Sequence, residues 1–129
     1  MPREITSHKV NGCNDRLTLE ALDGPGPGGA SHHYRVRGPE KQVLGIGMVP
    51  SFEQSVWFQN GPLKESGING TTHEVLLAII EDRLVGFQSG PYACPENGEA
   101  LANIQSAQRI LNSRTEARLA RGVEGTHTA

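Results

Sequence analysis

The chain has 129 residues, of which 36% are hydrophobic, and its 12 Lys and Arg nearly balance its 14 Asp and Glu. This length fits one modest domain or two sub-domains that share a core. The basic residues are scattered, so the sequence lacks the basic face that DNA requires, whereas a small anion needs only a few cations. No run approaches the roughly 20 apolar residues of a membrane helix, and the first ten residues contain no signal peptide. We expect a soluble cytoplasmic protein that binds neither DNA nor a membrane.

The cysteine and histidine pattern predicts no metal site and no cofactor. Cys13 and Cys94 lie far apart in the sequence and form no CxxC motif, so we expect two free thiols. His32 and His33 are adjacent, and adjacent strand residues point to opposite faces, which makes chelation of one ion by this pair difficult.

The first half of the chain reads as short strands broken by Gly and Pro, most simply an antiparallel meander. The expected strands are five: Arg3–Val10, Arg16–Leu22, Ser31–Arg37, Gln42–Val49 and Ser55–Gln59. Asn11-Gly12 is expected to form a tight turn. Gly24–Gly29 is too rich in Gly and Pro for regular structure and is expected to be a flexible connection, with a second interpretation as a loop over a bound ligand.

The second half predicts a helical hairpin. A polar linker at 61–70 separates it from the strands, so we divide the chain into a β-sheet sub-domain (1–66) and a hairpin sub-domain (67–129) of an α+β protein. Thr71 and Glu74 form a capping box that starts the first helix, and Gly90-Pro91 ends it. Its apolar face consists of Leu76, Ile79, Ile80, Leu84 and Phe87. The second helix is expected to run from Pro95 to Arg121, with Gly122 as its cap.

The apolar stripe of the second helix continues into cationic residues. The stripe is formed by Leu101, Ile104, Ala107, Ile110 and Leu111. Stepping on by three and four residues reaches Arg114, Arg118 and Arg121. One interpretation is a protruding helix with solvated arginines that interact favourably with the helix dipole. The other is a guanidinium fork for the phosphates of a ligand.

Two residues beside the inter-helix turn complete a candidate nucleotide site. Phe87 offers a flat apolar wall for a base, and Asn97 offers a donor and an acceptor for a polar edge. The arginines lie at the far end of the second helix, so one chain can hardly bring all of these side chains to one small ligand. Two antiparallel copies can, and the sequence therefore predicts a site shared across a dimer.

The chain resembles the phage anti-Thoeris nucleotide-sponge family, and its helical hairpin is similar to that of the phage anti-CBASS sponge. The stretches that carry the resemblance are FQNGPLKESGING, NGTTHEVLLAIIEDRL, FQSGPYAC, ENGEAL and RTEARLARGVEGTH. It is dense over 55–127 and fainter upstream, in HKVNGCND and in the Gly/Pro-rich loop followed by HHYRV. Residues 38–54 lie outside it.

This resemblance implies a viral protein that sequesters, without cleaving, cyclic nucleotide immune signals of the host. The chief ligands in the family are glycocyclic ADP-ribose isomers made by Thoeris TIR enzymes. By position, Phe87, Asn97, Arg114 and Arg118 match residues that line the cyclic ADP-ribose pocket in relatives, and the family forms homodimers or hexamers. Certain members also hold cyclic di- or trinucleotides in separate pockets.

We therefore expect a non-enzymatic nucleotide binder in the host cytoplasm, with Arg121 beside the other arginines. The terminal residues Gly125, Thr126 and His127 are candidates for a second cyclic-nucleotide site; a helix cap with a frayed tail explains them equally well. The rivals for the function are an enzyme that degrades the signal and a helical protein-interaction module.

Overall fold

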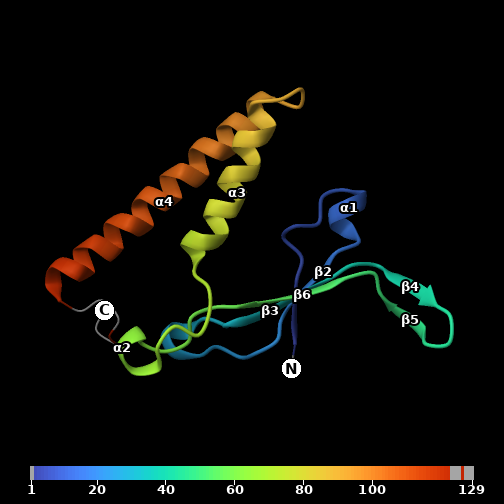
Figure 1. The fold of residues 1–129 in the computed structure, drawn as a ribbon, viewed down its shortest axis with the longest axis horizontal. Coiled ribbons are helices and arrows are strands. Elements are labelled where there is room, and N and C mark those ends of the chain that lie inside the picture. The colour runs from blue at the N-terminus through green and yellow to red at the C-terminus, as the bar shows by residue number, and fades with distance from the viewer. Residues whose placement is uncertain (1, 123–125, 127–129) are drawn as a thin grey trace. The chain divides into compact units, whose positions relative to one another are not determined.

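The computed structural model describes residues 2–122 and 126; for Pro27 it describes the backbone only. It has the α+β fold expected from the sequence, with an antiparallel sheet followed by a helical hairpin (Figure 1). By internal contacts the chain divides into two compact units, Met1–Gly61 with Ile68–Gly70, and Pro62–Gly67 with Thr71–Ala129. We refer to them as the sheet unit and the hairpin unit.

The sheet unit contains a four-stranded antiparallel sheet in the order β1-β2-β3-β6. Its strands are β1 (Arg3–Ile5), β2 (Thr18–Ala21), β3 (His33–Arg37) and β6 (Glu53–Trp57). The register places Leu19 opposite both Ile5 and Val36, and Ala21 opposite Tyr34. These residues share one face, and Ala21 has no exposed surface. The opposite face is polar and carries Glu20, Arg35 and Arg37, because successive strand residues alternate between faces.

An ion-pair cluster crosses the polar face. The Glu20 carboxylate accepts hydrogen bonds from Arg35 (2.8 Å) and Arg37 (2.9 Å) on the neighbouring strand. The hydrogen bond from Arg35, opposed in part by burial, holds the pKa of Glu20 below its usual 4.5. Each arginine therefore keeps its charge paired across β2 and β3.

Three connections in the sheet unit differ from the prediction. Asn11-Gly12 does not form a hairpin turn: Asn11 caps the one-turn helix α1 (Gly12–Asp15), accepting a hydrogen bond from the Asn14 amide at 2.8 Å. The Gly/Pro loop contains a 3-10 turn, η1 (Pro27–Gly29), with positive φ at Gly28. The prediction of one strand over 42–49 is wrong, because the chain reverses between β4 (Glu40–Val43) and β5 (Gly47–Pro50).

The β4–β5 hairpin follows β3 and precedes β6 in the chain, and it forms a two-stranded sheet separate from the one in which β3 and β6 pair (Figure 1). Its turn is closed by the hydrogen bond from Ile46 N to Val43 O (3.0 Å) and uses positive φ at Gly45 (82°) and Gly47 (106°). Leu44 at the tip is 98% exposed. Ile46 and Met48, which also suggested a strand, are 73% and 56% exposed.

The hairpin unit begins with the short helix α2 (Leu63–Ser66) and contains α3 (His73–Gln88) and α4 (Pro95–Arg121). The helices meet at their connecting turn and diverge away from it (Figure 1). The expected limits of α4 are confirmed, with Pro95 in the first turn and Gly122 in the left-handed cap position (φ 72°). Thr72 rather than Thr71 caps α3, through the Val75 amide (3.2 Å), so the predicted capping box is wrong by one residue.

The face that α3 presents to α4 is more polar than expected. Residues 74, 77, 81, 84 and 88, spaced by three and four, form this seam. Its central carboxylate, Glu81, accepts hydrogen bonds from Gln105 (3.2 Å) and Gln108 (3.3 Å) of α4. The apolar residues Val75 and Ile79 lie on the opposite side of α3 and are 50% and 53% exposed.

Both cysteines are free thiols, and the Sγ of Cys94 accepts a hydrogen bond from the Asn97 amide at the start of α4.

No helix in the described residues is long and apolar enough to cross a membrane. Within the same residues, no cluster of three or more His, Cys, Asp or Glu is arranged to hold a metal ion.

Candidate functional site

The aromatic end of the hairpin is built by the last turn of α3 and the connecting turn. Phe87 is 41% exposed and meets Tyr92 edge to face, with ring centroids 6.4 Å apart and an interplanar angle of 71°. The guanidinium carbon of Arg83, one turn earlier on α3, lies 5.6 Å from the centre of the Phe87 ring. Phe87 is therefore the centre of a small aromatic and cationic cluster. The sequence signals for Tyr92 and Arg83 were the turn stretch GPYAC and the four-residue spacing from Arg83 to Phe87.

Asn97 lies on the first turn of α4, just after the turn that connects the two helices. Its backbone amide is used by the Cys94 thiol (3.4 Å), which positions the start of the helix. Its half-buried side-chain amide forms no hydrogen bond with another described residue. A donor and an acceptor are thus available at the start of α4.

The three arginines near the C-terminal end of α4 differ in their exposure to solvent. Arg118 is 7% exposed, and its guanidinium donates to the Thr126 carbonyl oxygen at 3.3 Å. Arg114, one turn earlier, is exposed and forms no ion pair with a described residue, and Arg121 is exposed at the end of the helix.

The half-buried stripe continues through Leu111 and Thr115 to the buried Arg118, but Arg114, which was also assigned to this stripe, is exposed, so its assignment to the inward face is wrong. Ile110 is 69% exposed, so its assignment to that stripe is wrong. Of the terminal candidates only Thr126 is described; Gly125 and His127 lie outside the described residues.

The two ends of the hairpin cannot meet within one chain. Asn97 and Arg114 lie on one uninterrupted helix, Pro95–Arg121. At 1.5 Å per residue their 17-residue separation corresponds to about 26 Å along the axis. That distance exceeds the reach of any one side chain. Phe87 near the end of α3 and Asn97 near the start of α4 therefore lie on the two sides of the connecting turn, and the arginines lie at the other end of α4.

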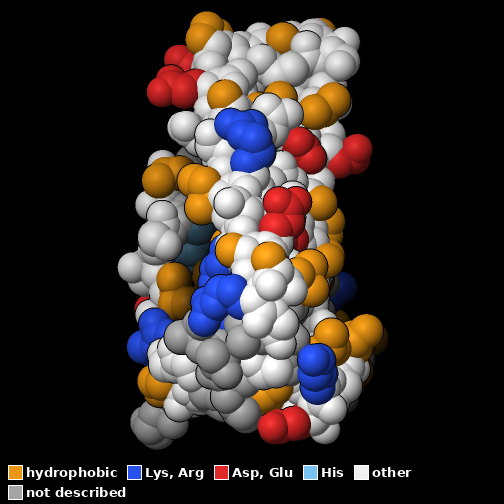
Figure 2. All heavy atoms as spheres, turned by 90° about the vertical axis from the view of Figure 1, so that its left-hand side faces the viewer, with side chains coloured by type: hydrophobic (Ala, Val, Ile, Leu, Met, Phe, Trp, Pro, Cys, Tyr) orange, Lys and Arg blue, Asp and Glu red, His pale blue; other side chains and the backbone are white. Residues whose placement is uncertain are grey.

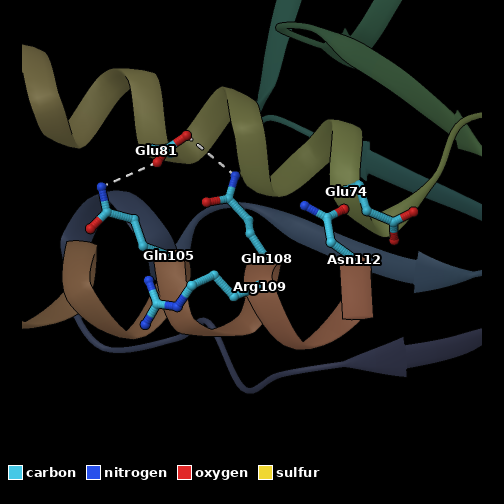
Figure 3. A pocket seen from close by; sticks show the side chains of 6 residues that line it. All are labelled: Glu74, Glu81, Gln105, Gln108, Arg109 and Asn112. Carbon is cyan, nitrogen blue, oxygen red and sulfur yellow. Dashed lines mark hydrogen bonds between the residues drawn. The ribbon is translucent and has the colours of Figure 1, made fainter. Parts of the chain in front are cut away.

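A polar groove, which sequence reasoning missed, lies between α3 and α4 (Figure 3). It has a volume of about 670 Å³ and is lined by Glu74, Glu81, Gln105, Gln108, Arg109 and Asn112. Figure 3 shows Glu81 reaching from α3 toward the amides of Gln105 and Gln108, with Glu74 and Asn112 farther along the groove.

The charge of this groove makes it a poor phosphate site. Glu74 and Glu81 contribute two carboxylates against the single cation Arg109, whose Nη2 also donates to Ser106 Oγ at 2.9 Å. The two carboxylates would repel the negative charge of a phosphate bound in the groove. On the side of the molecule drawn in Figure 2, basic and acidic side chains are likewise interspersed with hydrophobic ones.

These features define a class of protein: a small sheet unit followed by a helical hairpin that carries an aromatic cluster at its turn and arginines at the other end of α4. The comparison with protein families agrees, since residues 53–116 match the model of the Acb2/Tad1 hairpin domain. The chain is also 45% identical over 98 residues to "Thoeris anti-defense 1" of Bacillus phage SBSphiJ7, an alignment that covers 74% of this chain. It covers 66% of that relative's length. The chain belongs to the anti-Thoeris sponge family of Acb2/Tad1 hairpin proteins.

Proposed function

We propose that this protein counters Thoeris immunity by sequestering a cyclic ADP-ribose-type signal, chiefly a glycocyclic ADP-ribose isomer, without cleaving it. Family membership and the 45% identity to a phage protein named Thoeris anti-defense 1 support the anti-defence role. The observation that carries the binding mechanism is the separation of the aromatic cluster from the arginines along α4. We assign ligand binding and oligomerisation to the hairpin sub-domain, residues 67–129.

The proposed site takes residues from two chains. Phe87 and Asn97 of one copy would hold the base and a polar edge, because an aromatic ring stacks on a base and an amide offers both donor and acceptor. Arg114 and Arg118 of the other copy would hold the pyrophosphate, with Arg121 beside them. Guanidinium groups bind phosphate oxygens in pairs and remain charged at every physiological pH.

The outer face of α3 supports self-association. Val75 and Ile79 fall on the side of α3 opposite the seam with α4, Ile80 and Phe87 lie on a flank of the helix, and each of the four is between 41% and 53% exposed. Exposed apolar side chains at helical spacing form the kind of surface that a second helix covers. We propose that a second copy covers this face, as a homodimer or within a hexamer, because such packing places the turn of one hairpin near the arginines of its partner.

A binding role fits the chemistry at the cationic end better than hydrolysis does. Glu116, the carboxylate nearest to Arg114 and Arg118 in sequence, is exposed and forms no hydrogen bond with another described residue. A general base needs a positioned partner within hydrogen-bond reach of the proton that it removes. We propose that the protein acts stoichiometrically, so its efficacy depends on slow release of the ligand.

The experiment is capture and release. The protein is incubated with a glycocyclic ADP-ribose isomer, separated from free ligand, heat-denatured, and the supernatant is assayed for ligand by mass spectrometry and for activation of the Thoeris effector. Recovery of intact, active ligand at a fixed ratio to protein supports sequestration. A converted product shows that the protein is an enzyme.

A protein-interaction module is the second candidate, and the exposed apolar face of α3 favours it. Calorimetry with a panel of cyclic nucleotides separates the two functions, since no heat with any of them would favour the interaction module. The same panel should include cyclic di- and trinucleotides, because we propose a second pocket for these ligands at Gly125, Thr126 and His127. The site of action would be the host cytoplasm, where the signal is made.

A further inference from the structure

A second pocket lies wholly within the sheet unit, at the end of strands β3 and β6. Its volume is about 360 Å³. Its most prominent wall is Trp57, which stacks on His33 with ring centroids 3.4 Å apart and planes within 10° of parallel. Trp57 is nevertheless 57% exposed, so His33 covers only part of the indole. The stack holds the indole in place and leaves a flat aromatic surface open.

A fixed carboxylate forms the second wall. Both oxygens of Asp23 accept from the His32 backbone amide at 3.0 Å, and Oδ1 also accepts from the His33 amide at 3.1 Å. The hydrogen bond from the His33 amide, followed by that from His32, lowers the pKa of Asp23 below its usual 3.8, so the group is ionised at neutral pH. These three contacts leave part of the carboxylate's capacity of about four acceptor sites unused.

A pair of asparagines forms the third wall. Asn69 clamps the chain after β6: its Oδ1 accepts from the Asn60 amide (2.8 Å), and its Nδ2 donates to the Asn60 carbonyl (2.7 Å). The side-chain amide of Asn60 itself forms no hydrogen bond with another described residue. The clamp therefore fixes the Asn60 backbone and leaves its amide available beside the aromatic wall.

The same segment returns closely to β6 at Gly70. A Cβ atom there would lie 2.4 Å from the Phe58 carbonyl carbon, so only glycine permits this approach. Phe58, Asn60 and Asn69 all line the pocket, and the close return holds them together.

The charge and size of the pocket limit its ligand. No Lys or Arg lines it, and the Asp23 carboxylate repels an anion, so a phosphate is disfavoured there although the rings of His32 and His33 also line the pocket. A volume of about 360 Å³ is at the small end of the roughly 300–1,000 Å³ range of ligand sites. One nucleoside suits such a volume, whereas a cyclic dinucleotide does not.

We propose that this pocket binds an adenosine-type nucleoside, with the base stacked on Trp57, its N6/N7 edge paired with the Asn60 amide, and a ribose hydroxyl donating to Asp23. An asparagine amide matches the donor and acceptor of the adenine N6/N7 edge. Stacking on an aromatic side chain is a general mode of base recognition, and a carboxylate is a common acceptor for ribose hydroxyls. Any phosphate on the ligand remains outside, in solvent.

None of the hairpin arginines lines this pocket, and one of its walls is a fluorescent probe. Trp57 is the one tryptophan of the chain, so tryptophan fluorescence reports on this pocket. Adenosine is titrated into the full-length protein, with guanosine, uridine and adenosine monophosphate as comparison ligands. We expect saturable quenching by adenosine, at least tenfold weaker binding of the other two nucleosides, and no tighter binding of the monophosphate.

Matched variants locate the signal. Asn60→Ala should weaken adenosine at least tenfold without changing the melting temperature, because its side chain has no partner within the described residues. Asp23→Asn, which keeps one carbonyl acceptor for the backbone amides, should weaken adenosine severalfold. Arg114→Ala should leave the quenching unchanged, and this control separates the pocket from the proposed hairpin site.

Three results would overturn the proposal: no saturable quenching up to the solubility of adenosine, tighter binding of the monophosphate than of adenosine, or unaltered affinity in Asn60→Ala. Calorimetry on Trp57→Phe gives a readout that does not require the indole. A retained aromatic wall should keep adenosine binding within about tenfold, and complete loss would contradict stacking as its basis. Failure of the proposed function would instead appear as an absence of cyclic ADP-ribose binding with normal adenosine quenching.

Discussion

Replacing Arg114 with alanine should separate binding from stability. Arg114 is exposed and has no ion pair within the described residues, so its loss removes no contact of the described fold. Surface substitutions of this kind change the free energy of unfolding by about 0.5 kcal/mol or less. For a chain of this size that corresponds to a change in melting temperature of about 1–3 °C. In the ligand complex the same guanidinium would form a bidentate pair with a phosphate.

The loss of that pair sets the size of the binding effect. Hydrogen bonds to charged groups contribute about 1.5–3 kcal/mol each, so two of them amount to about 3–6 kcal/mol. At tenfold per 1.4 kcal/mol, the affinity for a glycocyclic ADP-ribose isomer should fall by about 10²- to 10⁴-fold. Calorimetry and thermal melting on the same preparation measure both quantities. Arg114→Lys, which keeps the charge but loses the planar fork, should give an intermediate affinity.

The comparison with Arg118 sharpens the result. Arg118 is 7% exposed and hydrogen-bonded to the Thr126 carbonyl, so Arg118→Ala should lower both affinity and melting temperature. Binding by Arg114→Ala within threefold of the unmodified protein would refute the proposed phosphate contact. A collapse of melting in Arg114→Ala would show that the residue is structural.

Three further predictions concern the fold. Gly70→Ala should destabilise the sheet unit by about 1–3 kcal/mol, because a Cβ would lie 2.4 Å from the Phe58 carbonyl carbon; a denaturant midpoint equal to that of the unmodified protein would contradict the close approach. Glu81→Ala should destabilise the hairpin by about 1–3 kcal/mol, since two glutamine amides lose their acceptor. Thermal melting followed by the circular-dichroism signal of the helices measures the loss, and an alanine substitution of an exposed acidic residue on the same helix is the control. Because the hydrogen bond from Arg35 lowers the pKa of Glu20 below 4.5, the stability from this pair is present above pH 4.5 and is lost as the pH falls through the lowered pKa. Acid titration of Glu20→Gln should lack that part of the decline, and an unchanged profile would show that the pair does not contribute.

Local signals were sufficient for the second helix of the hairpin. Pro95, the acidic Glu96 in its first turn and Gly122 after its last residue agree with each other, and α4 has the expected limits. The sheet strands β1, β2 and β3 also fall within their predicted ranges, because alternation of apolar residues coincides with one buried face. Strand β6 begins two residues before its predicted start and ends two residues before its predicted end.

The errors arose where a partner surface, rather than the local sequence, decides the arrangement. The apolar face predicted for α3 was expected to pack on α4, but three of its members, Ile79, Ile80 and Phe87, are 53%, 44% and 41% exposed. Glu81 occupies the seam because two glutamines supply its hydrogen bonds. Leu44 suggested a continuous strand, although Gly45 allows a tight reversal at that point. Periodicity counts apolar residues but does not identify what covers them.

The aromatic pocket of the sheet unit was not predicted at all. Asn60 and Asp23 are 37 residues apart in the sequence and meet only because β3 and β6 pair. Trp57 was assigned to the last strand, and nothing in its neighbourhood indicated a pocket. Such sites depend on register and loop return, which local patterns do not specify.

Subunit complementation tests the shared-site hypothesis most directly. Phe87→Ala and Arg114→Ala chains are prepared separately, mixed, dissociated and reassembled, and binding of a glycocyclic ADP-ribose isomer is measured by calorimetry. If one copy supplies Phe87 and the other supplies Arg114, each mixed dimer has one intact site, and about a quarter of all sites should bind with the affinity of the unmodified protein. Reassembled mixtures that bind no better than either variant alone would contradict a site shared between two chains.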